Sequence, residues 1–233
     1  DEAYAAHSMT SPHSSPGDLP SIVPIFPLRG AILLPRASLT LNVFEPRYLA
    51  LVDHALANER LIGVVQPAGE TGSTESPRGK SFPVRNVGCV GRITSFNETD
   101  DGPEVISLTG ITRFVLGDEL ASDTPFRIFS ANFLPYADDF IHDLGEDEVD
   151  RVRLLSTLRH YLETNGLNAD WDRINEAANE QLVNTLSILS PYGSEEKQAL
   201  LEAGSLKERA DALVALAEME LAARDDSSGT SLQ

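Results

Sequence analysis

The chain is poor in cysteine, in basic residues and in long apolar runs. Its 233 residues include a single cysteine, Cys89, which excludes an internal disulfide and zinc sites built from several cysteines. Lys and Arg number 18 against 36 Asp and Glu, so the formal net charge is −18. This balance disfavours binding to a phosphate backbone, which depends on basic side chains. No stretch approaches the ~20 apolar residues that a membrane span needs.

The N-terminal region also lacks a basic segment followed by an apolar one, which is the pattern of a secretory signal. Together with the lone cysteine, this predicts a reducing, cytoplasmic location. Apolar residues make up 41% of the chain, which is enough for a folded core.

Composition and periodicity divide the chain into four parts. Residues 1–19 are rich in Ser, Pro and His and are expected to form a disordered tail. Residues 20–137 have β character, and residues 138–224 have helical character. Residues 225–233 form a polar tail. The charge divides in the same way: 15 acidic and 10 basic residues lie before residue 138, and 21 acidic and eight basic residues follow.

Short apolar runs separated by Gly, Pro, Asn and Asp predict a sheet in the first half. The proline-broken run at 22–28 is typical of an edge strand, because proline cannot donate to the ladder. A helix is expected at 46–58, and an exposed, mobile loop at 67–83. The predicted strands are 22–28, 39–43, 61–66, 87–96, 104–108, 110–116 and 126–134.

After residue 145 the apolar period becomes helical. Helices are expected at 146–165 and 171–189. Ser194 is expected to cap a short third helix. A final helix at 206–223 begins with a capping box formed by Ser205 and Glu208.

No motif in the sequence indicates catalysis. Gly79-Lys80-Ser81 lacks the upstream glycine of a phosphate loop and is followed by Phe82-Pro83 instead of a helix. The five histidines show no metal-ligand spacing. Cys89 lies in an apolar strand, where a buried and inert thiol is expected. The sequence therefore predicts no catalytic residue, no cofactor and no metal.

Arg29, Glu45 and Arg47 interrupt apolar segments and have two interpretations. In the first, Glu45 lies at a helix N-terminus and pairs with one of the two arginines in a structural network. In the second, the three side chains recognise a peptide backbone or carboxylate. The apolar residues Phe26, Leu28, Phe44, Tyr48 and Phe96 are likewise expected in the core, in a binding groove, or in both.

Three motifs resemble the N-terminal substrate-binding domain of Lon proteases, in the order that the family shows. They are Phe26-Pro27-Leu28-Arg29, Phe44-Glu45-Pro46-Arg47-Tyr48 and Gly88-Cys89-Val90-Gly91-Arg92-Ile93. The resemblance implies an α+β fold, with a PUA-like β pseudo-barrel and a C-terminal helical bundle. It also implies a stand-alone bacterial form without the ATPase and protease domains, and it names no catalytic residue.

The resemblance favours a non-enzymatic module that binds exposed apolar or unfolded polypeptide segments. Such a module would serve as an adaptor or a chaperone-like factor, with a protease or a chaperone as partner. The peptide-binding residues expected are Phe26, Leu28, Arg29, Phe44, Glu45, Arg47 and Tyr48. A PUA-like RNA-binding protein is the alternative, which the charge of −18 opposes. An enzyme of unknown type is a third hypothesis.

Overall fold

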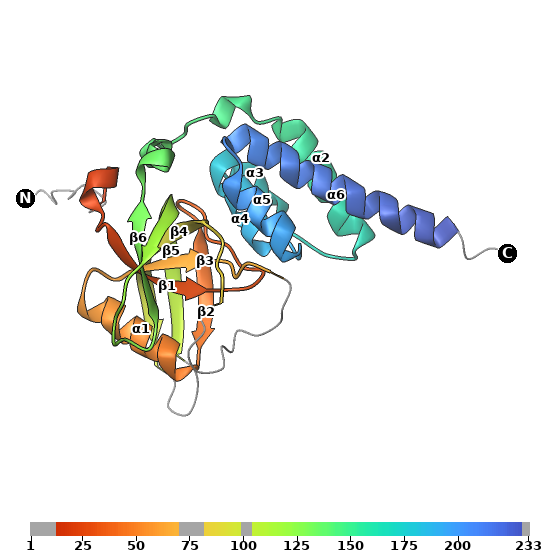
Figure 1. Cartoon of the computed structure of the whole chain (residues 1–233). Coiled ribbons are helices and arrows are strands. Elements are labelled where there is room, and N and C mark those ends of the chain that lie inside the picture. The colour runs from red at the N-terminus through yellow and green to blue at the C-terminus, as the bar shows by residue number, and fades with distance from the viewer. Residues whose placement is uncertain (1–12, 70–81, 99–103, 230–233) are drawn as a thin grey trace, which may run out of the picture.

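The computed structural model describes residues 13–69, 82–98 and 104–229, with side chains up to residue 224. A β-rich half and a helical half lie next to each other (Figure 1). The first half contains β1 (Ile22–Pro27), β2 (Ser38–Val43), α1 (Pro46–Ala57), β3 (Leu61–Val65), β4 (Val87–Asn97), β5 (Glu104–Glu119) and β6 (Arg127–Asn132). The second half contains α2 (Arg151–Thr164), α3 (Trp171–Glu176), α4 (Asn179–Leu189), α5 (Ser194–Glu202) and α6 (Leu206–Gly229).

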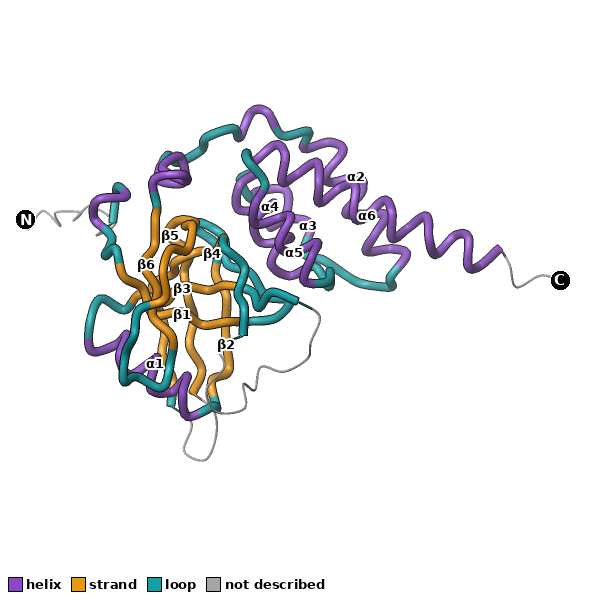
Figure 2. The backbone as a smooth tube through the Cα atoms, in the orientation of Figure 1, coloured by secondary structure: helices purple, strands orange, loops and turns teal. Residues whose placement is uncertain are grey.

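The six strands form one sheet in the order β2-β5-β4-β3-β1-β6, and β6 also pairs with the far end of β5. The sheet therefore curls back on itself (Figure 2). Only β1 and β3 run parallel, and the other pairs are antiparallel. The predicted α+β class, with strands first and helices after residue 145, is confirmed. None of the described helices combines the length and the apolar character that a membrane span requires.

The two strands predicted at 104–108 and 110–116 are one strand, β5. The predicted break fell at Thr109, next to Gly110, which serves a close backbone contact. Its N–H donates to Ala37 O at 2.9 Å, and its O accepts from Arg36 N at 2.8 Å. A Cβ at this position would lie 2.0 Å from Leu34 O. The glycine thus admits a crossing loop without interrupting the strand.

The expectation that the proline-broken run 22–28 is an edge strand is wrong. β1 pairs with β6 on one side and with β3 on the other. Pro24 is tolerated because pairing with β3 begins only at Ile25, so Pro24 has one neighbouring strand. The strand with a single partner in the described sheet is β2, which pairs with β5 alone.

The helix predicted at 146–165 begins five residues late. Residues Glu146–Glu148 form a 3-10 turn, and α2 starts at Arg151. Asp150 is its N-cap, since the carboxylate accepts from Arg153 N at 3.0 Å. Val152 is 81% exposed, and Leu154 is the buried residue of this first turn.

The single helix predicted at 171–189 is two helices, with Ala177 and Ala178 extended between them. The start of α4 is capped by a side chain from a distant part of the chain. Glu146 accepts from the backbone N–H groups of Asn179, at 2.8 Å, and Glu180, at 2.5 Å. Because this carboxylate satisfies the free N–H groups, a second helix can begin inside the segment predicted as one helix.

Other helix ends also differ from expectation. Gly193, not Ser194, is the N-cap of α5. The capping contact of α6 is confirmed, because Glu208 N donates to Ser205 Oγ at 3.1 Å; the Glu208 carboxylate reaches back to Gly204 N at 2.9 Å. The last helix continues to Gly229, past the expected end at 223. At the other end of the chain, Leu19 is buried, so order extends into the expected 1–19 tail.

The main hydrophobic cluster crosses the boundary between the two halves. It joins the interior of the sheet and one face of α1 to buried positions of α2, α4, α5 and α6. A smaller cluster lies around Val23, Ile25, Phe114, Phe129 and Phe133. The helices are thus packed onto the sheet and share its core. Members on the helical side include Leu154, Leu182, Val183, Leu200, Leu201, Leu206, Leu213 and Val214.

Candidate functional site

The residues expected to bind peptide divide into a buried group and an exposed one. Phe26 and Tyr48 are both buried, with ring centroids 4.2 Å apart. The Arg47 guanidinium lies 4.6 Å from the centre of the Tyr48 ring. Burial raises the pKa of the Tyr48 hydroxyl. These two aromatic rings are core residues that fix the start of α1 against β1.

Glu45 forms the predicted ion pair, and its partner is Arg47. The Glu45 carboxylate accepts from Arg47 Nε at 3.0 Å, and it makes no side-chain bond to the helix N-terminus. Arg29 is not brought to this pair: its Nη2 donates to Gly69 O at 3.2 Å. Leu28 is half-buried against the core. The ion pair expected by the structural interpretation is therefore present between Glu45 and Arg47.

Phe44 is the exposed aromatic member of the set, and Arg29 is exposed too. Phe44 follows β2 directly and is 70% exposed, which is unusual for a large aromatic side chain. The exposed residues of β2 itself are uncharged: Ser38, Thr40 and Asn42. An edge strand without charge, followed by an exposed aromatic ring, offers backbone N–H and C=O groups next to an apolar side chain.

A second apolar feature lies in the helical half, between α2, α4 and α6. This helical groove has a volume of about 270 Å³. Seven leucines line it, and Leu167 and Leu189 at its edge are 54% and 74% exposed. No described charged residue lines it. Its lining residues are Leu154, Thr157, Leu158, Tyr161, Leu162, Leu167, Leu186, Leu189, Ser190, Pro191, Tyr192, Leu213, Val214 and Ala217.

The helical groove has one polar corner. Tyr161 Oη donates to Glu220 Oε1 at 3.4 Å, and Glu220 also pairs with Arg224. Burial, reinforced by Tyr161 and Glu220, raises the pKa of Tyr192 to about 12. Both phenols therefore stay neutral at physiological pH.

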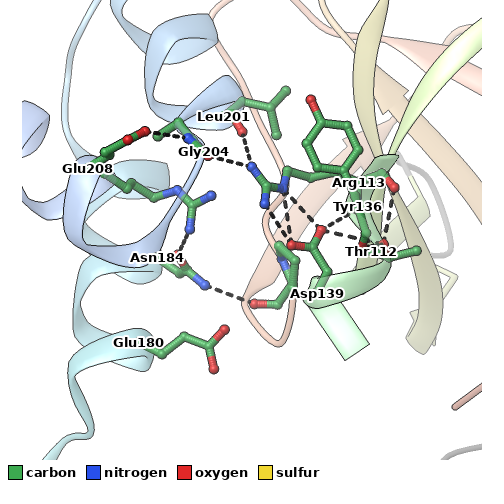
Figure 3. A network of polar contacts seen from close by, with 12 residues as sticks. Thr112, Arg113, Tyr136, Asp139, Glu180, Asn184, Leu201, Gly204 and Glu208 are labelled. Atoms are coloured by element: carbon green, nitrogen blue, oxygen red, sulfur yellow. Dashed lines mark hydrogen bonds and ion pairs between the residues drawn. The ribbon is translucent and has the colours of Figure 1, made fainter. Parts of the chain in front are cut away.

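A buried network joins the helical half to the sheet (Figure 3). Arg113 of β5 is 6% exposed and Asp139 is 7% exposed, and the two form a bidentate pair. The guanidinium also stacks over the Tyr136 ring at 4.3 Å. Arg209 of α6 donates to Asn184 Oδ1 at 2.9 Å. Burial, with Arg113 nearby, lowers the pKa of Arg209 to about 10.

Further contacts fix the same interface. Asn184 Nδ2 donates to Pro35 O at 3.1 Å, and Arg36 forms an ion pair with Glu180. Gln66 at the end of β3 donates to Ser194 O at 2.8 Å. These polar residues were not predicted from the sequence, because their partners lie more than 100 residues away along the chain.

The other groups considered for catalysis or metal binding do not form a site among the described residues. Cys89 is fully buried, as predicted, and burial raises its pKa well above the ordinary value. No three His, Cys, Asp or Glu side chains in the described ranges are arranged to hold a metal ion. The Gly79-Lys80-Ser81 stretch and most of the 67–83 loop lie outside the described residues.

The family model for the substrate-binding domain of the ATP-dependent protease La (Lon) matches residues 22–218, which include all six strands and nearly all of the helical half. The chain belongs to the Lon substrate-binding domain family. The Lon protease of Parabacteroides distasonis is 30% identical over 197 residues, which are 81% of this chain and 22% of that protein. The Lon protease of Flavobacterium johnsoniae is 28% identical over 199 residues, or 83% and 23% of the two chains.

This chain therefore spans less than a quarter of the length of those Lon proteases. Two solved structures share the fold. A Lon N-terminal domain protein from Xanthomonas campestris has a TM-score of 0.55 at 21% identity, covering 84% of this chain and 98% of that chain. The N-terminal domain of Mycobacterium avium complex Lon protease has a TM-score of 0.61 at 17% identity, with the same coverage. The β2 edge and the helical groove both lie inside the segment that matches the Lon family.

Proposed function

We propose that this chain is a non-enzymatic module that binds extended, apolar polypeptide segments at the β2 edge, next to Phe44. The observation that carries the proposal is the pairing of the sheet, in which β2 has β5 as its single described partner. An extended peptide can pair with such an edge as an additional strand. The matched family, named for substrate binding in Lon, supports a role in polypeptide recognition.

Side chains beside the edge would add apolar contact to the backbone pairing. Phe44 is exposed, and Leu39 and Leu41 are only partly buried. Burial of apolar surface contributes ~25 cal/mol per Å² before ordering costs are subtracted. Ordering an extended chain costs much of this gain, so weak, micromolar binding is expected. Weak binding of short exposed segments suits an adaptor or a chaperone-like factor that hands clients to a protease or a chaperone.

Four of the remaining predicted residues would support the site without touching the peptide. The buried Phe26–Tyr48 ring pair and the Glu45–Arg47 ion pair fix the turn that carries Phe44. Leu28 and Arg29 directly follow β1 and would contact only a longer peptide. The helical groove is the competing location, because it offers a deeper apolar surface but no strand edge.

The test is a titration of a fluorescently labelled, unfolded polypeptide with the full chain and three variants. Phe44→Ser removes the exposed ring, and Asn42→Lys places on the edge a charge of the kind that blocks strand addition. Ser95→Lys is the matched control: Ser95 is exposed like Asn42, but it lies on β4, which β5 separates from the β2 edge. Each β2 variant should weaken binding several-fold, and the Ser95 variant should not.

Two results would count against the proposal. Absence of saturable binding by the wild-type chain would contradict polypeptide recognition itself. Unchanged binding by the β2 variants, with loss of binding in Leu189→Asp, would place the site in the helical groove and contradict the β2 location.

A further inference from the structure

We propose that a second cavity, between β4, β5 and the 3-10 segment Leu134–Phe140, binds a small organic carboxylate with an apolar body. This β4–β5 cavity has a volume of about 450 Å³, within the range typical of small-molecule sites. Its wall is apolar along Ile111 and Phe140, and a few polar side chains converge on it: Arg92, His13, His142 and Thr94. The proposal does not depend on polypeptide binding at β2.

Arg92 supplies the charge for this ligand. In a chain with twice as many acids as bases, most described arginines pair with a carboxylate or a backbone carbonyl. Arg92 is half-buried, and its guanidinium forms neither an ion pair nor a hydrogen bond with any described residue. A half-buried guanidinium without an anion is a natural partner for a carboxylate, which it can bind through two parallel hydrogen bonds.

His13 adds a second unsatisfied group. Its Nδ1 is buried and has no hydrogen-bond partner among the described residues. Burial, followed by the charge of Arg92, lowers the pKa of this imidazole. The positive field of Arg92 therefore reaches the part of the cavity where the imidazole lies. A bound anion would offset that field and give the imidazole a partner.

The other charged groups at the wall are already paired. The Asp139 carboxylate is held by Arg113, and the Arg36 guanidinium is held by Glu180 and by Asp139 O. One positive charge thus remains available, with Asp139 close by. This balance favours a singly charged carboxylate over a phosphate, whose greater negative charge would be repelled by Asp139. The apolar wall then contacts the body of the same ligand.

Such a carboxylate has two possible sources, a free organic acid or the C-terminal residue of a polypeptide. Isothermal titration of the full chain with N-acetylphenylalanine, and with its amide, tests the shared chemistry without any variant. A short peptide ending in phenylalanine, with a free or an amidated C-terminus, distinguishes the two sources. Arg92→Gln removes the proposed anion partner. Arg159→Gln is the matched control, because Arg159 stacks on Trp171 in the helical half, away from the cavity lining.

The free acid should bind saturably, and its amide should bind at least tenfold more weakly. Arg92→Gln should lower the affinity for the acid at least tenfold, and Arg159→Gln should leave it unchanged. Binding of the free-carboxylate peptide would assign the cavity to chain ends, and binding of N-acetylphenylalanine alone would assign it to small acids. Equal binding of acid and amide, an unaffected Arg92→Gln variant, or no binding of either acid or peptide would overturn the proposal.

Discussion

Arg113 Nη2 lies 2.7 Å from Asp139 Oδ1, and the same guanidinium donates through Nη1 to Leu201 O at 3.1 Å and to Ala203 O at 2.7 Å. One side chain of the sheet thus binds a buried carboxylate and the C-terminal end of α5. Since free carbonyls at a helix end favour a cation, the arginine stabilises both the ion pair and the helix terminus. This relationship positions the helical half on the sheet.

Replacement of Arg113 should therefore destabilise the whole chain. Arg113→Met leaves Asp139 buried without its cation, and breaking a buried pair from one side typically costs about 3–5 kcal/mol. Urea unfolding should show this loss as a lower midpoint. Arg153→Met is the matched control, because the Arg153–Glu218 pair is about half exposed and should contribute little. Equal effects of the two variants would contradict the role given to Arg113.

Gly110→Ala should destabilise the fold through a steric clash. The added Cβ would lie 2.0 Å from Leu34 O and 2.7 Å from Leu34 C, which are backbone atoms that cannot move aside alone. Overpacking of this kind costs about 1–3 kcal/mol or more. Thermal unfolding should reveal it, and Gly17→Ala should be nearly neutral because its nearest contact is at 3.9 Å. A neutral Gly110→Ala would show that the loop does not cross β5 so closely.

Lys197 should make the stability depend on pH in the alkaline range. Its ammonium is buried and donates to the carbonyls of Ser187 and Ile188, and burial lowers its pKa from 10.5 to about 8. Between these two pKa values the unfolded chain binds more protons than the folded one, so the free energy of unfolding rises with pH from 8 to 10.

The free energy of unfolding of the wild type, minus that of Lys197→Met, should therefore increase by roughly 2 kcal/mol between pH 7.5 and pH 10. Taking the difference cancels other groups that titrate in this range, such as Cys89. Lys207→Met is the control, since this exposed lysine has its pKa raised by Asp211 and should show no such trend below pH 10. A flat difference for Lys197→Met would mean that its ammonium is not desolvated in the folded state.

Polypeptide binding should persist at high salt. Apolar burial and backbone pairing are not screened by ions, whereas contacts between basic side chains and phosphates weaken steeply with salt concentration. The affinity for an uncharged unfolded probe should change less than about threefold between 50 mM and 500 mM salt. A steep loss over this range, together with binding of single-stranded RNA, would favour the RNA-binding alternative instead.

Local patterns in the sequence predicted much of the fold. The Ser205 capping contact and the Glu45–Arg47 ion pair join residues that are two or three positions apart, so the sequence alone revealed them. The break between α3 and α4 was missed because its cap, Glu146, lies more than 30 residues upstream. The strand break predicted between 104–108 and 110–116 was wrong. Gly110 contacts a loop that crosses β5, and no local sequence pattern reveals such a contact.

The candidate site was predictable only in part, for the same reason. Phe26 and Tyr48 were expected in the core, in a binding groove or in both, and the structure buries both rings. The open edge at β2 could not be predicted, because it depends on which strands pair. The proline-containing β1 pairs with two strands, whereas β2 pairs with one. Arg113 and Asp139 gave no local signal, because 26 residues separate them along the chain.

The most direct test of strand addition is amide hydrogen exchange of the full chain, with and without a saturating apolar peptide. If the peptide adds as a strand, amides of β2, residues 38–43, should exchange more slowly in the complex, because the N–H groups on the free edge of β2 would become hydrogen-bonded. Amides of residues 89–92 of β4 should be unchanged, since that part of the strand is already paired on both sides. Unchanged exchange in β2, with new protection around the helical groove, would contradict the account.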